Sequence, residues 1–205
     1  MTEPRLQLYG PAPRRVGAGR LCSICVAAWC AGAAFLVSAS PGAAGYADGA
    51  PPGFSGGFKE QSCDGCHFEN EPNTKPGEVT LSGVPERFVG GEKYPLSVTL
   101  TRPGMKLGGF QLAARFEDGT QAGALERGPD EDQRLAIEVQ GNVHYANQRR
   151  AGTGLTGPDT AKWTLVWTAP AEARPVTFSV AANAADNDES TRGDYVYTTT
   201  ADSRP

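Results

Sequence analysis

Two cysteines and a histidine stand close together in the stretch Cys63-Asp64-Gly65-Cys66-His67. With this spacing, both thiols can form thioether bonds with the vinyl groups on one edge of a porphyrin, and the adjacent imidazole can ligate its iron. The motif therefore predicts one covalent haem c, held by Cys63 and Cys66 and ligated by His67.

The thiol pair has two other interpretations. One is a reversible disulfide, but catalytic thiol pairs normally begin a helix that lowers the thiolate pKa, and this Gly/Pro-rich setting offers none. The other is structural zinc, for which Cys63, Cys66, His67 and His144 supply the required four ligands. Adjacent Cys66 and His67 fit one tetrahedral ion poorly, so we expect haem.

The sixth coordination position of the iron has few candidates. Beyond His67, the strong ligands in the mature chain are His144 and Met105. His144 would give a bis-imidazole haem of low potential, Met105 would give a higher potential, and an open position would admit small ligands. We expect His67 and His144 to be the metal ligands, with the other two arrangements as alternatives.

The N-terminal segment has the features of an export signal. Several arginines precede an apolar run over residues 21–38, and small residues near Ala47 offer a cleavage region. We expect residues 1–47 to be a signal peptide of a periplasmic or otherwise exported protein. An N-terminal membrane anchor is the alternative, because an apolar run of about 18 residues can span a bilayer.

Cleavage would change the cysteine content and the charge. It would remove Cys22, Cys25 and Cys30 and leave only Cys63 and Cys66, in a compartment where haem c is attached and an unoccupied thiol pair would oxidise. The 19 basic and 23 acidic residues would become 15 and 22, a net charge of −7. Such a surface argues against nucleic acid and favours a redox partner protein with a basic docking face.

The mature chain divides into parts of different composition. Residues 48–77 are rich in glycine and proline, as expected of an irregular segment, and contain the haem motif. Over residues 78–200, short alternating apolar runs are separated by turn residues, which is typical of an antiparallel sandwich or barrel. Residues 201–205 form a short tail.

Seven runs of alternating or β-prone residues predict about seven strands. The residues expected on the inner faces are Leu96, Val98 and Leu100; Phe110, Leu112, Ala114 and Phe116; Leu135, Ile137 and Val139; Trp163, Leu165 and Trp167; and Val176, Phe178 and Val180. Residues 79–81 and 195–197 add two more strands. We expect an all-β, antiparallel, Ig-like sandwich in which residues 181–185 prolong a strand and the acidic loop 186–194 is a solvated turn.

An ordinary small cytochrome c is excluded, because such domains wrap the haem in helices. Only about ten residues separate His67 from the first expected strand, too few for a long helix and its loops. The sandwich or its loops must therefore cover the porphyrin.

Four stretches carry a resemblance to a known group: residues 108–115, 162–170, 176–186 and 193–197. They resemble the reelin-like (Reeler) β-sandwich of exported bacterial proteins, also called the choice-of-anchor V domain, whose members often carry CxxCH in a Gly/Pro-rich leader. The resemblance spans residues 53–200 and implies a β-sandwich with a covalent haem, but no settled reaction. Many relatives end in an anchor, whereas this chain ends at Pro205, and we expect no stable membrane anchor after signal cleavage.

Three functions remain open at this point. The first is a periplasmic monohaem c-type cytochrome-like protein in electron transport. The second is a haem-based sensor or oxidoreductase with an open coordination site. The third is a non-haem extracytoplasmic interaction domain with a structural CxxC. No Ser/His/Asp set indicates a hydrolase. We expect the first, a carrier of electrons without catalytic residues.

Overall fold

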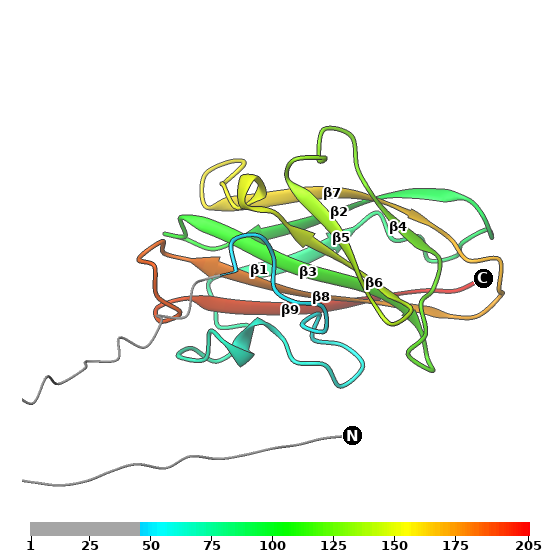
Figure 1. Ribbon diagram of the computed structural model, residues 1–205, viewed down its shortest axis with the longest axis horizontal. Coiled ribbons are helices and arrows are strands. Elements are labelled where there is room, and N and C mark those ends of the chain that lie inside the picture. The colour runs from blue at the N-terminus through cyan, green and yellow to red at the C-terminus, as the bar shows by residue number, and fades with distance from the viewer. Residues whose placement is uncertain (1–45) are drawn as a thin grey trace, which may run out of the picture. The chain divides into compact units, whose positions relative to one another are not determined.

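The computed structural model describes residues 46–205, so most of the expected signal peptide, with Cys22, Cys25 and Cys30, lies outside the described residues. The described chain is built from nine strands and two single 3-10 turns (Figure 1). These are η1 (Cys63–Gly65), β1 (Glu78–Ser82), β2 (Lys93–Thr101), β3 (Leu107–Phe116), β4 (Ala124–Arg127), β5 (Leu135–Gln140), β6 (Val143–Gln148), η2 (Arg150–Gly152), β7 (Thr160–Thr168), β8 (Val176–Ala185) and β9 (Tyr195–Ser203). Within residues 46–205, no helix is long and apolar enough to cross a membrane.

The strands form two antiparallel sheets. One has the order β1-β2-β7-β4 and the other the order β5-β6-β3-β8-β9. Long pairings join β2 to β7 and β3 to β8, so strands far apart in the sequence lie side by side. The expected all-β antiparallel sandwich is confirmed.

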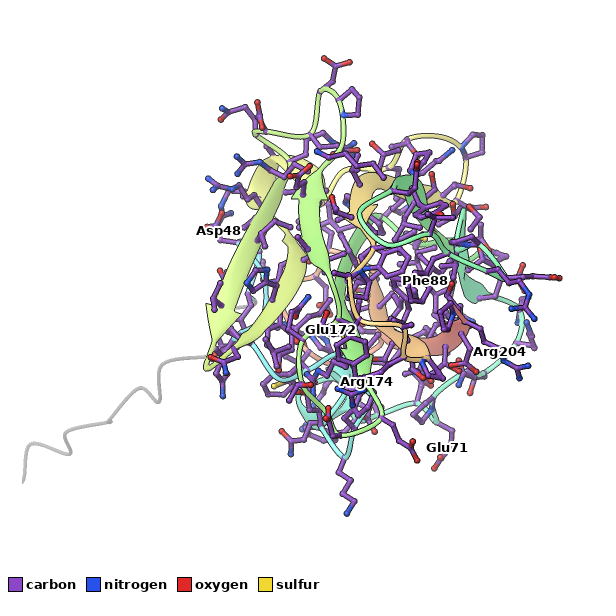
Figure 2. The ribbon with its side chains drawn as sticks, turned by 90° about the vertical axis from the view of Figure 1, so that its right-hand side faces the viewer. Asp48, Glu71, Phe88, Glu172, Arg174 and Arg204 are labelled. Atoms are coloured by element: carbon purple, nitrogen blue, oxygen red, sulfur yellow. The ribbon has the colours of Figure 1, made fainter. Side chains whose placement is uncertain are left out.

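The core lies between the two sheets, where the apolar side chains of alternating residues meet (Figure 2). Trp163 and Trp167 of β7 are fully buried and pack on the opposite sheet, with ring centroids 4.6 Å from Phe110 and 4.9 Å from Phe178. Each indole N–H donates to a backbone carbonyl, so the burial of these large rings leaves no polar atom unpaired. The inward rows expected on β2, β3, β7 and β8 are confirmed.

Other expectations differ from the structure in detail. The polar strand β6 and the short strand β4 were not among the seven expected, because neither has a clear apolar alternation. Val139 is 59% exposed rather than inward, since β5 is an edge strand whose end extends beyond the core. Residues 181–185 do prolong β8, and β9 continues past residue 200 to Ser203.

The segment from residue 48 to residue 77, which we call the leader, covers the outer face of the five-stranded sheet (cyan in Figure 1). As a result β3 and β8 are buried on both faces, and their outward residues Gln111, Arg115 and Ser179 are at most 5% exposed. A sheet face that would otherwise be solvated thus becomes the base of the site described next.

Candidate functional site

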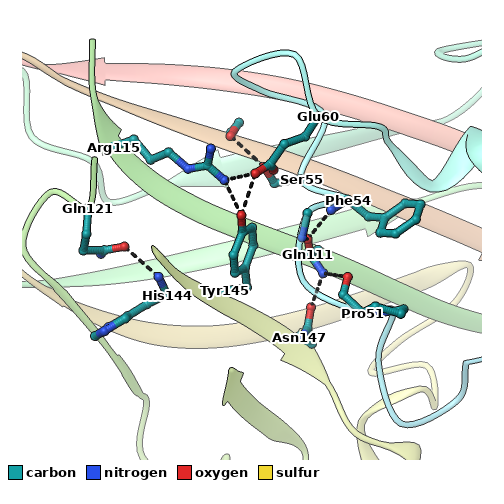
Figure 3. A network of polar contacts seen from close by, with 12 residues as sticks. Pro51, Phe54, Ser55, Glu60, Gln111, Arg115, Gln121, His144, Tyr145 and Asn147 are labelled. Atoms are coloured by element: carbon teal, nitrogen blue, oxygen red, sulfur yellow. Dashed lines mark hydrogen bonds and ion pairs between the residues drawn. The ribbon is translucent and has the colours of Figure 1, made fainter. Parts of the chain in front are cut away.

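Gln111 of β3 fastens the first part of the leader to the sheet (Figure 3). Its side chain is fully buried and has five partners within hydrogen-bonding distance. Its Oε1 accepts from the N–H groups of Gly53 and Phe54, and its Nε2 donates to the carbonyls of Ala50 and Pro51 and to Oδ1 of Asn147. A single amide therefore satisfies the backbone of an irregular segment that has no sheet partner here.

A buried ion pair fastens the next part. Glu60 of the leader accepts from Arg115 of β3, from the hydroxyl of Tyr145 at 2.5 Å and from Ser55 at 2.7 Å (Figure 3). Burial alone would raise the pKa of Glu60, but the hydrogen bonds from Tyr145, Arg115 and Ser55 outweigh it and lower that pKa below 4.5. Burial, followed by the hydrogen bond to Glu60, raises the pKa of Tyr145 to about 12.

The CxxCH motif follows directly and folds into the turn η1. The N–H groups of Cys66 and His67 both donate to the carbonyl of Cys63, at 3.2 and 3.0 Å. Both cysteines are free thiols of intermediate exposure. Burial raises the pKa of the Cys63 thiol to about 12, so this group is protonated at neutral pH, unlike the activated thiolate of a dithiol catalyst.

The His67 side chain contacts the β8–β9 loop. Its Nδ1 lies 2.6 Å from Oδ2 of Asp194, a carboxylate that is only 2% exposed. Asn183 of β8 donates its Nδ2 to the same oxygen at 3.1 Å and lies 3.3 Å from Nδ1 of His67. Because a carboxylate accepts hydrogen bonds, a neutral imidazole with its proton on Nδ1 would donate to Asp194 and leave Nε2, which lies 3.5 Å from Nδ2 of Asn183, as the nitrogen that a metal could bind.

All three side chains of the motif border one cavity of about 610 Å³. Its other walls come from the start of the leader, the first residues of β3, the end of β8 and the β8–β9 loop. Apolar residues such as Phe54, Leu107 and Phe110 line it together with a few polar groups. This size and lining are typical of sites for small molecules and cofactors.

The lining residues fit a covalently held haem. Cys63, Cys66 and His67 line the same cavity, and two free thiols with an imidazole are the donor set that the cofactor requires. In addition, Oδ1 of Asn183 is buried and finds no hydrogen-bond partner among the described residues. Buried polar atoms are normally paired, so this oxygen is an exception beside the cavity.

The structure does not bring the expected sixth ligands to this cavity. His144 lies on β6, where its backbone N–H donates to Gln121 at 2.8 Å, and it is absent from the cavity lining (Figure 3). Met105 is 4% exposed and packs in the core between the sheets. Across residues 46–205, no three His, Cys, Asp or Glu side chains are close enough to share a metal ion, so the four zinc ligands considered above are not assembled.

Sequence reasoning missed the residues that hold the motif in place. The loop 186–194 was interpreted as a solvated turn, which is correct for Asp188 and Glu189 but wrong for Asp194. Asp194 ends an otherwise exposed acidic run, and it is buried where His67 and Asn70 of the leader meet Asn183 of β8. The available signal was its place directly before the apolar start of β9.

Comparison with known proteins shows similarity in fold only. No protein-family model matches the chain, and no curated protein matches it. Among solved structures, the human F-spondin reeler domain aligns at 14% identity over 66% of this chain and 93% of that chain, with a TM-score of 0.41. A structure of the Reelin-N domain of F-spondin aligns at 14% identity over 70% of this chain and 96% of that chain, with a TM-score of 0.44.

A cohesin module from a Clostridium perfringens family 33 glycoside hydrolase is also similar. It aligns at 9% identity over 64% of this chain and 97% of that module, with a TM-score of 0.47. The chain is thus similar in structure to reeler domains and cohesins. At these identities and scores the similarity concerns the β-sandwich and carries no functional inference.

Proposed function

We propose that this chain is an exported monohaem c-type protein that transfers electrons, with haem c bound to Cys63 and Cys66 and ligated by His67. The observation that supports this best is the cavity of about 610 Å³ bordered by all three of these side chains. When bound, the haem supplies one-electron chemistry at iron. The resemblance to exported reelin-like proteins with a CxxCH leader supports the same proposal.

The chain's own residues have defined tasks in this proposal. Gln111 and Glu60 hold the leader on the sheet, so that the motif stays at one end of the cavity. Phe54 and Leu107 border the cavity as apolar residues that would exclude water from the porphyrin face. Asp194 orients the ring of His67.

A partner surface lies beside the motif. Phe68, the residue after His67, is 71% exposed, and Glu69 and Glu71 next to it are also exposed. An apolar contact with an acidic rim suits a redox partner that presents a basic face, because opposite charges guide the two proteins together.

The position of His144 favours a second candidate function. Since neither His144 nor Met105 lines the cavity, neither of the two expected side chains occupies the sixth coordination position in this arrangement. An iron with an open position binds small ligands, as a sensor or an oxidoreductase requires. Carbon monoxide binding by the native ferrous protein would support this second candidate, whereas resistance to carbon monoxide would support a simple carrier.

The proposed function is tested by producing the protein in the periplasm of a bacterium that attaches haem c. We expect a c-type α-band in the reduced-minus-oxidised spectrum and an intact mass increased by one haem. Cys63→Ser with Cys66→Ser should abolish both signals.

His144→Ala is the matched control. It should retain the attached haem and leave the spectrum unchanged, because His144 lies outside the cavity. Absence of the α-band and of the added mass in the wild-type protein would refute the proposal and leave the interaction domain as the remaining function.

A further inference from the structure

We infer that Asp194 is a positioning residue for the iron ligand His67, and that its buried carboxylate makes the reduction potential of the haem lower than an uncharged partner would. This inference rests on the proposed function, because it concerns the haem that His67 would ligate. Its structural basis is the contact of 2.6 Å between Nδ1 of His67 and Oδ2 of Asp194, together with the burial of that carboxylate.

The β8–β9 loop contacts the leader at three points, one at His67 of the motif and two just after it. Besides the His67–Asp194 pair, Glu69 accepts from the N–H of Gly193 at 2.6 Å, and Asn70 donates to the carbonyl of Asp194 at 2.8 Å. These contacts therefore fix the position of residues 69–70 relative to residues 193–194. The carboxylate itself is held toward His67 by the hydrogen bonds that it accepts from Asn183 and from the N–H of Asp186.

The carboxylate has hydrogen-bond donors but no lysine or arginine partner. Its Oδ1 accepts from the N–H of Asp186 at 3.2 Å, and its Oδ2 accepts from Asn183 and from His67. Within the described chain, no lysine or arginine forms an ion pair with Asp194, and His67 is the one basic side chain in contact with its carboxylate. Its negative charge is thus directed mainly at the imidazole.

Two consequences for an iron ligand follow from this geometry. First, a proton held on Nδ1 fixes the tautomer and the ring orientation, so that Nε2 is the donor atom. Second, a buried anion that accepts from Nδ1 increases the electron donation of the imidazole, which stabilises ferric iron relative to ferrous iron. Hydrogen bonding of this kind is one of the means by which a protein sets a haem potential.

Asn183 modulates the same contact. Its Nδ2 donates to Oδ2 of Asp194 and so shares the oxygen that His67 uses. Removing this competing donor should concentrate the negative charge on His67. Asp194 and Asn183 are therefore expected to shift the haem potential in opposite directions when each is replaced by a neutral residue of similar size.

The test uses the haem-loaded protein and compares Asp194→Asn with Asp188→Asn. Asparagine at 194 can still accept from the N–H of Asp186, which favours an intact loop. Asp188 lies in the same loop and is exposed, so its replacement removes the same charge without touching His67. Asn183→Leu, located on β8 rather than in the loop, is the second variant.

The readouts are the midpoint potential and the iron–histidine stretching band in resonance Raman spectra, recorded on five-coordinate ferrous protein or directly after photolysis of its carbon monoxide adduct. We expect Asp194→Asn to raise the potential and move the band to lower frequency, Asn183→Leu to lower the potential, and Asp188→Asn to change neither appreciably.

Two results would overturn the inference: an unchanged potential and band in both Asp194→Asn and Asn183→Leu, or an equal shift in Asp188→Asn. A misfolded Asp194→Asn protein leaves Asn183→Leu to decide. Failure of the proposed function is seen separately, because the wild-type protein would then lack the haem spectrum and the added mass.

Discussion

Replacement of Glu60 by alanine should detach the leader from the sandwich. Glu60 is 16% exposed and its partner Arg115 is 6% exposed, so the variant leaves a buried guanidinium without its carboxylate. Breaking a buried pair by removing one partner costs about 3–5 kcal/mol. Because Arg115 keeps its hydrogen bond to Tyr145, we expect a loss of unfolding free energy at the lower end, about 3 kcal/mol.

Urea unfolding followed by tryptophan fluorescence measures this loss. At a slope of about 2 kcal/mol per molar urea, the midpoint should fall by about 1.5 M. Glu71→Ala is the matched control, since Glu71 belongs to the same leader but has an exposed side chain (Figure 2). It should leave the midpoint within about 0.3 M of the wild type, as expected of a surface change.

Hydrogen exchange separates local detachment from global unfolding. In Glu60→Ala, the N–H of Gly56, which donates to Gln61 within the leader, should exchange faster even where the core strands remain protected. Equal stability of the Glu60→Ala and Glu71→Ala proteins would refute the view that the Glu60–Arg115 pair holds the leader.

Three further outcomes follow from the packing. Folding lowers the pKa of Glu60, so its ionised carboxylate stabilises the protein above about pH 4.5, and this stabilisation is lost as the pH falls through the lowered pKa. The urea midpoint should therefore fall less on acidification in Glu60→Gln than in the wild type. Trp163→Ala removes a fully buried ring stacked on Phe110 and should cost about 3–5 kcal/mol in urea unfolding. Gly57→Ala should weaken the packing of the leader on the sheet, because a Cβ at this position would lie 2.4 Å from Oγ of Ser179. The amides of the leader should then exchange faster with solvent, and unchanged exchange would contradict the close approach of Gly57 to Ser179.

The strands that alternate apolar and polar residues could be predicted from the sequence. Trp163, Leu165 and Trp167 repeat with period two, which fixes both the strand and its inner face. Strand β6 could not be found in this way, because only Ala146 of Val143–Gln148 belongs to the core, whereas Tyr145 is buried where it meets Glu60 of the leader. The alternation of apolar and polar residues predicts only those strand faces that are buried against apolar neighbours.

The candidate site could be predicted only in part, because some of its residues are far apart in the sequence. Cys63, Cys66 and His67 are adjacent in the sequence, so their spacing alone indicates their chemistry. Asp194 lies far from them along the chain, and the two come together through the return of the β8–β9 loop onto the leader. His144 was favoured because histidines are few, which says nothing about distance in the fold.

Because the leader covers the five-stranded sheet, neither the leader nor the sandwich is complete when the two are expressed separately. A shortened chain that starts at Glu78 would expose to water the amide of Gln111, the guanidinium of Arg115 and the hydroxyl of Ser179 on a bare sheet face. Conversely, a peptide that contains Cys63, Cys66 and His67 but ends at Gly77 would lack the sheet on which the leader is held. Transplanting the motif to a foreign β-sandwich therefore requires that the recipient strand also carry counterparts of Gln111 and Arg115.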